Sequence, residues 1–432
     1  MKVLIRLSIA ATSVAATMLV VFGVLPIVVA QAAAPTKLYV AQGGVNSGSC
    51  PKSSPCATIT YALTQAGADP TIEVSGTIDD HVAATAPVTI TGADAPLGSP
   101  AVLNGTDTGT DLTISEAAVK IDDLTIEGGS AGDGGGISDP DGSLTIVGST
   151  ISGNSSSNAG AGIFSEGPLT ITDSTISGNS AGGSGGAIYE WGSTATITDS
   201  TISENSASSG AVAILAGTIT TGATILAGNI GGNCSGSSTF VDVGYNLTND
   251  ATGTACGFTR PTDKVNTNPD LGSLANNGGL TETMLPPLSS PATDAIPKGT
   301  TVNGVSVCPG KDQRGFARPG PGESHCSIGA VEAGLGATKV SLVSSANPGV
   351  TGVAVTYTAT VSPLPGGGTM KFTSDGTAIS GCKSNAINNT TGKATCNVTY
   401  ATAGSFKIKA AYSGDATFAR STSKALTETV NT

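Results

Sequence analysis

A segment of about 25 residues recurs along the middle of the chain, and it constrains the fold more than any other feature. Three copies align without gaps, reading LTIVGSTISGN at 144–154, LTITDSTISGN at 169–179 and ATITDSTISEN at 195–205. Corresponding positions are therefore 25 and 26 residues apart. Self-similarity at a fixed period of this length is the signature of a solenoid, in which each repeat packs mainly against its neighbours.

Each repeat contains three short apolar or threonine-containing segments separated by Gly, Ser, Asn and Asp, and it shows no helical period. The LTI and STI segments alternate apolar with polar residues, as half-buried strands do. Three strands and three polar corners per repeat predict one coil of a right-handed parallel β-helix, with equivalent residues stacked about 4.8 Å apart. We expect isoleucines inside the coils and Asn154, Asn179 and Asn205 in a corner ladder of side-chain amides.

The N-terminal residues 1–32 have the pattern of a secretory signal peptide. Lys2 and Arg6 precede a long apolar run, which is followed by Ala30-Gln31-Ala32, a cleavage site with small residues on either side of Gln31. The run is long for a signal peptide, so an uncleaved membrane anchor is the alternative. We expect the mature chain to be exported and not inserted in a membrane.

Charge is distributed unevenly along the chain. Residues 53–259 contain 21 Asp and Glu but no arginine and one lysine, Lys120, which gives this stretch a formal charge of −20. Such a surface repels nucleic acid, anionic lipid and uronate polysaccharides. Polysaccharide lyases use a strongly basic side chain, so the near absence of cations also argues against a lyase.

Eight cysteines are consistent with an oxidising compartment. Their positions in the predicted domains suggest four local disulfides, although other connectivities are possible. None has the closely spaced CxxC doublets that zinc sites prefer. The expected pairs are Cys50 with Cys56, Cys234 with Cys256, Cys308 with Cys326, and Cys382 with Cys396.

The segments on either side of the repeats should close the ends of the solenoid. Residues 37–63 differ from the repeat and should cap the first coil, which together with the coils gives a β-helix domain at 35–259. Residues 260–335 are rich in Pro and Gly, which predicts short strands and turns that cover the C-terminal end.

The tail carries several short motifs: Asn268-Pro269, Asn277-Gly278-Gly279, Asp312-Gln313-Arg314-Gly315 with Arg318-Pro319, and Ile328-Gly329-Ala330. With the repeats and the N-terminal YVA…PCATI pattern, these motifs make residues 37–332 resemble the choice-of-anchor Q family of secreted bacterial right-handed β-helix proteins. The resemblance implies a β-helix attached to or released from the cell surface, with no established activity for most members.

Residues 336–432 form a separate module of alternating apolar and polar segments, spaced as in a β-sandwich. The AYSGD motif at 411–415 resembles bacterial Ig-like repeats, which implies that Tyr412 and Phe418 are core aromatics. The Cys382–Cys396 disulfide should staple neighbouring strands. The fold class is therefore all-β, with a β-helix followed by an Ig-like sandwich.

Asp173 and Asp199 are the first candidates for a catalytic site. They occupy the same position in consecutive repeats, one rung apart. A glycoside hydrolase needs two carboxylates about 5–9.5 Å apart, so the spacing is somewhat short. The alternative is that both aspartates cap corners beside Ser174 and Ser200.

Asp133, Asp139 and Asp141 lie in one acidic turn, DGGGISDPDG, which is a candidate calcium site because calcium prefers oxygen ligands from short acidic loops. The turn lacks EF-hand spacing, and a solvated turn is the alternative. We predict no other cofactor.

Thr150, Thr175 and Thr201 should stack outward as a flat hydroxyl array, which is the pattern expected of an ice-binding face. The alternative is that threonine is simply a favourable outward strand residue.

Tyr189 and Trp191 follow the GGAI segment and are either exposed ligand contacts or aromatics tucked against a coil edge. We expect Arg314 and Arg318 to pair with Asp312, Glu323 or Glu332 and to hold the tail.

These features together predict a secreted, non-catalytic bacterial cell-surface or extracellular protein. Its β-helix would act as a rigid display surface, and its Ig-like domain would serve adhesion or contact with extracellular glycan or protein. Two alternatives come from other classes: a glycan-active hydrolase using Asp173 and Asp199, and an ice-binding protein. The oligomeric state is not predicted.

Overall fold

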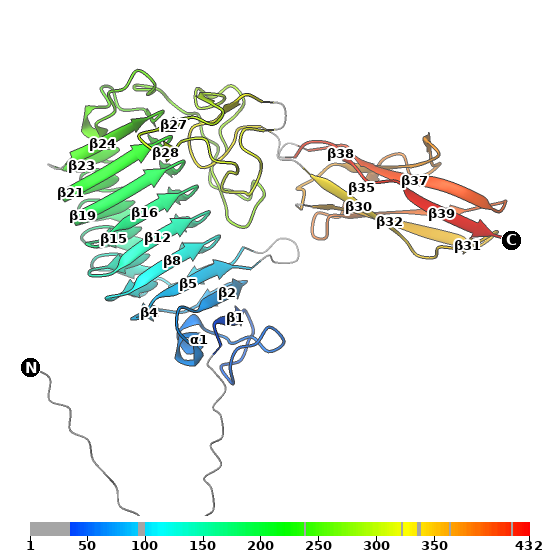
Figure 1. Cartoon of the computed structure of the whole chain (residues 1–432), viewed down its shortest axis with the longest axis horizontal. Coiled ribbons are helices and arrows are strands. Elements are labelled where there is room, and N and C mark those ends of the chain that lie inside the picture. Colours follow the sequence, from blue (N-terminus) through cyan, green and yellow to red (C-terminus); the bar gives the residue numbers. More distant parts are fainter. Residues whose placement is uncertain are drawn as a thin grey trace, which may run out of the picture. The chain divides into compact units, whose positions relative to one another are not determined.

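The all-β architecture is confirmed by a computed structural model, which consists of a parallel β-helix followed by an Ig-like sandwich (Figure 1). The structure describes residues 35–93, 100–236, 239–320, 323–334, 338–362, 364–415 and 418–432. The predicted signal peptide at 1–32 lies outside the described residues. Among the residues that the structure describes, no helix is long and apolar enough to cross a membrane.

Three parallel sheets build the β-helix, and each coil contributes strands to them. The first sheet has 14 strands: β1 (Lys37–Ala41), β2 (Thr71–Ser75), β4 (Val82–Ala84), β5 (Val88–Gly92), β7 (Leu112–Ile114), β8 (Ala118–Asp122), β11 (Ile137–Asp139), β12 (Ser143–Val147), β15 (Ile163–Ser165), β16 (Leu169–Thr172), β19 (Ile188–Thr198), β21 (Val212–Gly222), β23 (Cys234–Gly236) and β24 (Thr239–Gly244).

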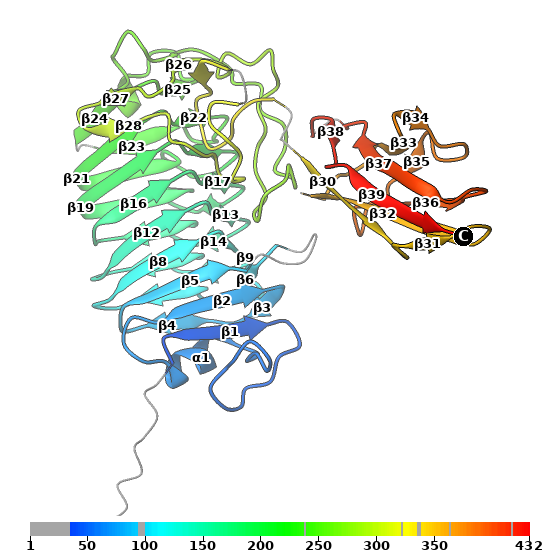
Figure 2. The same ribbon diagram turned by 45° about the vertical axis from the view of Figure 1, so that its right-hand side comes forward.

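The second sheet has eight strands, which Figure 2 shows rising beside those of the first: β3 (Thr77–Asp79), β6 (Val102–Asn104), β9 (Thr125–Glu127), β13 (Thr150–Ser152), β17 (Thr175–Ser177), β20 (Thr201–Ser203), β22 (Ile225–Ala227) and β25 (Leu247–Thr248). The third sheet contains β10 (Ser130–Ala131), β14 (Ser155–Ser156) and β18 (Ser180–Ala181).

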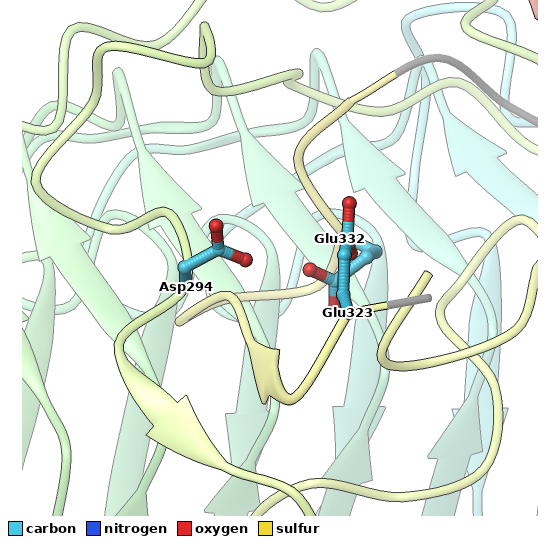
Figure 3. Close-up of side chains that lie close together, drawn as sticks. All are labelled: Asp294, Glu323 and Glu332. Atoms are coloured by element: carbon cyan, nitrogen blue, oxygen red, sulfur yellow. The ribbon is translucent and has the colours of Figure 1, made fainter. Parts of the chain in front are cut away.

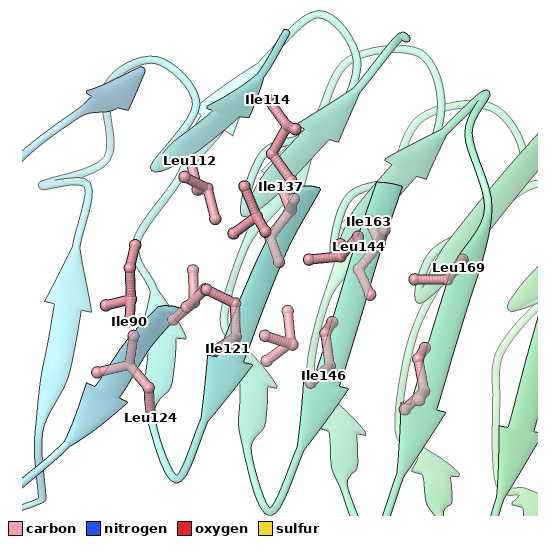
Figure 4. Close-up of a cluster of buried hydrophobic side chains, with 14 of the residues drawn as sticks. Ile90, Leu112, Ile114, Ile121, Leu124, Ile137, Leu144, Ile146, Ile163 and Leu169 are labelled. Atoms are coloured by element: carbon pink, nitrogen blue, oxygen red, sulfur yellow. The ribbon is translucent and has the colours of Figure 1, made fainter. Parts of the chain in front are cut away.

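Isoleucine and leucine columns fill the interior, as the period-two pattern predicts. In the first sheet Ile146 pairs in register with Ile171, and in the second sheet Ile151 pairs with Ile176. All four side chains are fully buried, and Figure 4 shows neighbouring members of these columns packed along the coils. Burying each such side chain stabilises the fold by about 1.5–3 kcal/mol.

The predicted asparagine ladder is present and is one coil longer than the repeat indicates. The Nδ2 of Asn154 donates to the Oδ1 of Asn179 at 3.0 Å, and Asn179 donates to Asn205 at 2.9 Å. Asn205 continues the ladder to Asn229 at 3.1 Å. The Oδ1 atoms of Asn179, Asn205 and Asn229 also accept the backbone N–H of the ladder asparagine in the preceding coil. These bonds satisfy the buried polar atoms of this corner.

The N-terminal segment caps the first coil. Strand β1 adds a rung to the first sheet, and α1 (Ile59–Gln65) follows it. Ile59 and Ala62 of α1 are fully buried in the core of the β-helix. The helix begins at Thr58, whose side chain accepts the backbone N–H of Tyr61.

Residues 217–257 form a further coil of the β-helix. Strand β24 pairs with β21, and β25 pairs with β22 in the second sheet. The short helix η1 (Thr254–Cys256) follows and brings Cys256 to Cys234. All four predicted disulfides are present.

The tail that follows has little regular structure. Its short strands are β26 (Ile296–Pro297), β27 (Thr301–Val302), β28 (Val305–Ser306) and β29 (His325–Cys326). Ile296, Val307 and Ile328 of the tail pack against Ile225 and Leu247 of the last coils.

The Ig-like domain is a sandwich of two sheets that are mainly antiparallel. Its strands are β30 (Lys339–Ser344), β31 (Gly349–Val350), β32 (Ala354–Ser362), β33 (Thr369–Ser374), β34 (Thr377–Ala378), β35 (Asn385–Ala386), β36 (Lys393–Thr399), β37 (Gly404–Tyr412), β38 (Ser421–Thr422) and β39 (Leu426–Asn431).

Tyr412 and Phe418 are buried in the core of this sandwich, as expected. Cys396 lies on β36 of the smaller sheet, whereas Cys382 lies between β34 and β35, which pair with β33 of the larger sheet. The Cys382–Cys396 disulfide therefore links the segment between β34 and β35 to β36 of the smaller sheet.

Candidate functional site

Asp173 and Asp199 occupy equivalent corners of consecutive coils, as the repeat predicts. The preceding residues, Thr172 and Thr198, are in register between β16 and β19. Both aspartates have a left-handed backbone, with φ of 48° and 49°, which aspartate tolerates better than most residues. The corner conformation explains the residue type without any catalytic role.

A side chain from the tail covers this aspartate pair. The guanidinium of Arg318 lies 3.6 Å from the Oδ1 of Asp173 and 3.7 Å from the Oδ1 of Asp199. It also lies 3.6 Å from Glu332 and donates to the backbone oxygens of Ser327 and Gly329. The Arg318 side chain is fully buried and faces three carboxyl groups, of which Asp199 and Glu332 are buried and Asp173 is 17% exposed.

Burial shifts the protonation of both aspartates. It raises the pKa of Asp173 to about 8, with a further increase from neighbouring Asp199 and an opposing effect of Arg318. Burial likewise raises the pKa of Asp199 to about 7, again opposed by Arg318. Because one guanidinium cannot neutralise three carboxylates, protonation of the aspartates reduces the charge of the cluster.

This geometry suits attachment of the tail better than hydrolysis. A hydrolase needs its two carboxylates on either side of a sugar that enters from solvent. Here Asp199 is 1% exposed and both aspartates face Arg318. The expected pairing of Arg318 with Glu332 is confirmed, as is that of Arg314 with Asp312 at 2.8 Å.

The partners of Arg318 on the β-helix were missed by sequence reasoning. Its contacts with Asp173 and Asp199 join residues more than 100 positions apart in the sequence, and no local pattern predicts them. The signal in the sequence is indirect: the arginine-free solenoid carries aspartates at equivalent repeat positions, and the tail that follows carries arginines.

The threonine column of the second sheet is buried, which corrects the predicted ice-binding array. The Oγ1 of Thr150 donates to the backbone oxygen of Glu282 at 2.6 Å, and that of Thr175 donates to Oε1 of Gln313 at 2.6 Å. The Oγ1 of Thr201 accepts the N–H of Ala330. The tail supplies every one of these partners, so this column is not a solvent-facing surface.

The acidic turn does not gather its aspartates around one point. The Oδ1 of Asp133 accepts from Asn158 and Ala159 of the next coil, and Asp141 accepts the N–H of Glu116 in the preceding coil. Asp139 faces inward and is fully buried. Each aspartate therefore caps a different part of the backbone, which does not favour calcium binding at this turn.

Another acidic group, formed by Asp294, Glu323 and Glu332, lies in the tail (Figure 3). It is the one such group found among the described residues. Glu332 already accepts the N–H and hydroxyl of Ser327 and lies beside Arg318, while Glu323 accepts the N–H of Gly320. Two of the three carboxylates thus have partners in the protein.

Buried carboxyl groups also line the inside of the coils. Asp139, Ser165 and Glu190 lie in register on β11, β15 and β19 at inward-facing positions that other coils fill with isoleucine. Asp139 accepts the N–H of Gly142, and Glu190 accepts that of Ser193. Burial raises the pKa of Asp139 to about 6 and that of Glu190 to about 7. These side chains cap corners from within.

The two predicted aromatic contacts have different environments. Tyr189 is 9% exposed and stacks on Phe164 of the preceding coil, with ring centroids 5.5 Å apart and planes 9° apart. Trp191 lies at a β-bulge of β19 and is 50% exposed. Tyr189 therefore fits the tucked alternative, whereas Trp191 is presented to solvent.

Comparison with known proteins identifies one part of the chain. Residues 342–431 match the family model of the bacterial Ig-like domain (group 3). The chain matches no curated protein and no solved structure. The disulfides and the bacterial Ig-like domain suggest an extracellular protein, and the combination with a β-helix is consistent with the cell surface.

Proposed function

We propose that this protein is a secreted bacterial surface protein that binds extracellular glycan or protein and does not catalyse a reaction. The β-helix is the rigid binding scaffold, and the Ig-like domain at 342–431 is an accessory adhesion module or spacer. The signal-peptide pattern at 1–32 and the resemblance of residues 37–332 to choice-of-anchor Q proteins support this assignment. The charge of −20 over 53–259 disfavours nucleic acid as a partner.

One observation carries the proposal. The carboxylate pair most like that of a glycosidase, Asp173 and Asp199, faces Arg318 beneath the tail. A sugar cannot reach both carboxylates unless the tail moves away, and that movement would leave the Arg318 cluster without its partners.

A glycan panel with reducing-end detection tests the absence of catalysis. We expect no turnover by the purified full chain on neutral or acidic polysaccharides. Turnover that disappears in both Asp173→Asn and Asp199→Asn would establish the hydrolase alternative in place of this proposal. Ser180→Asn, an exposed change on a neighbouring corner, is the matched control.

Cell fractionation tests the location. We expect the chain in the wall fraction or the medium of the producing bacterium, with its four disulfides formed. Recovery of the reduced protein from the cytoplasm would contradict the proposal, because the disulfides require an oxidising compartment.

A further inference from the structure

The outer surface of the first sheet contains a threonine-rich strip without charged side chains. In β12, β16, β19 and β21 the register aligns Thr145, Thr170, Thr196 and Thr220 in one column. Flanking columns contribute uncharged residues from the same strands: Ser143, Pro168, Thr194 and Thr218 on one side, and Val147, Thr172, Thr198 and Gly222 on the other. We call these residues the threonine strip.

The central column and the Ser143 column of the threonine strip are accessible to solvent, in contrast to the threonines of the second sheet, whereas Thr198 and Gly222 of the third column are buried. Pro168, Thr170 and Thr194 are exposed, and Thr145 and Thr196 are half-buried. Figure 1 shows the strands concerned, β12 to β21, side by side in one broad sheet. An uncharged surface is unexpected within a chain segment of charge −20, where outward positions are otherwise rich in carboxylates.

A depression of about 280 Å³ lies at one end of the strip. Its walls include Asp69, Pro87, Thr89 and Lys120, and it reaches Ser143 and Thr145 of the strip. The volume is close to the lower limit of about 300 Å³ for small-molecule sites. Lys120 contacts Asp122 at 2.7 Å, so the cation is locally neutralised while its ammonium still carries further donors.

An exposed aromatic side chain lies beside the strip on the third of its four strands. Trp191 precedes Thr194 by three residues on β19 and pairs with Ala216 of β21, which follows the exposed Leu215. Lys120 lies on β8. Three strand spacings, or about 14 Å, separate β8 from β19 across the sheet. Thr196, and not Trp191, is in register with Lys120 through Thr145 and Thr170, so Trp191 is also displaced from the depression by five residues, or about 16 Å, along the strand direction.

From these observations we infer that the threonine strip binds a neutral polysaccharide chain, with Trp191 and the depression at Lys120 as its two anchor points. The inference rests on the proposed binding function and names its site and ligand class. Threonine offers a hydroxyl and a methyl group, which match the hydroxyls and C–H faces of a pyranose, and indole rings stack well on such faces. A uronate chain is disfavoured because the surrounding carboxylates repel it.

Binding of the full chain to insoluble cellulose and chitin and to soluble amylose and dextran tests the inference, with polygalacturonate as the acidic comparison. We expect binding to at least one neutral polymer and none to polygalacturonate. Thr170→Glu and Trp191→Ala should each weaken this binding by about tenfold. Ser180→Glu adds the same charge at an exposed position of the third sheet and should leave binding unchanged.

The inference is overturned if no neutral polymer is bound, or if Thr170→Glu, Thr194→Glu and Trp191→Ala all bind as the wild type does. If the three variants bind as the wild type does, the protein still binds glycan, but the threonine strip is not the binding site. Inhibition of ice recrystallisation that is lost in Thr170→Glu, without polymer binding, would assign the strip to ice instead. Release of reducing ends would contradict the proposed function itself.

Discussion

The first and second sheets of the β-helix both carry a column of stacked threonines, yet only one column is accessible to solvent. Thr170 on β16 is exposed, whereas Thr175 on β17, five residues later, is fully buried. Both side chains point out of the coil from the same repeat. The difference arises because Glu282, Gln313 and Ala330 of the tail lie over the second sheet and form hydrogen bonds with its threonines.

The threonine hydroxyls of the two surfaces therefore need different hydrogen-bond partners. A covered column must satisfy each hydroxyl with a specific partner, such as Gln313 for Thr175. An open column can leave its hydroxyls to water and exchange them for ligand contacts. The attachment of the tail thus separates a structural face from a face that remains available for binding.

The largest effect is expected from removing the cation that holds the tail. Arg318→Met leaves the buried Asp199 and Glu332 and the half-buried Asp173 without their shared counter-ion, which should lower the free energy of unfolding by about 3–5 kcal/mol. Thermal unfolding and limited proteolysis of the tail measure this loss. Lys311→Met, an exposed change in the same segment, is the control. Equal stability of the two variants would mean that Arg318 does not hold the tail.

Raising the pH should loosen the same attachment, with a smaller effect than removing Arg318. A carboxyl whose pKa in the folded state exceeds its unfolded value of about 4 stabilises the fold fully at low pH. That contribution is lost as the pH rises through about 7 for Asp199 and about 8 for Asp173.

We therefore expect the melting temperature to fall between pH 5 and pH 9, and to fall less in the double variant Asp173→Asn with Asp199→Asn. The difference between the two profiles isolates this pair from the buried acids Asp139 and Glu190. Parallel profiles for the wild type and the variant would show that the aspartates do not titrate in this range.

The smallest effects come from a matched pair of threonine substitutions, which compares the two columns directly. Thr175→Val removes a buried hydrogen bond and leaves Gln313 Oε1 without that donor, so it should cost about 1–3 kcal/mol. Thr170→Val, at an exposed position, should change stability by less than about 0.5 kcal/mol. Equilibrium unfolding of both variants checks the contrast, and equal costs would contradict the assignment of one column as covered.

Much of the architecture follows from local sequence. The repeat predicts the coils, because the alternation of apolar and polar residues, as in Leu-Thr-Ile, buries one face and the spacing of 25 or 26 residues brings equivalent positions into register. The asparagine ladder follows as well, because Asn154, Asn179 and Asn205 recur at a corner and an amide both donates and accepts. The disulfides follow from the domain layout.

The candidate site was less predictable. Asp173 and Asp199 were correctly placed one rung apart, but their partner Arg318 comes from a tail without a repeat. Trp191 was recognised as a candidate ligand contact, whereas the threonine strip was overlooked. Its members, such as Thr145 and Thr196, have the same local pattern as the covered threonines, and only the position of the tail distinguishes them.

The sequence by itself thus determined the coil, its interior and the outward direction of its threonines, since these depend on contacts between adjacent repeats. Only the tertiary structure decided which outward surface is covered and which is open. That choice depends on long-range contacts of Gln313 and Arg318 with coils more than 100 residues away, and no periodic signal encodes such contacts.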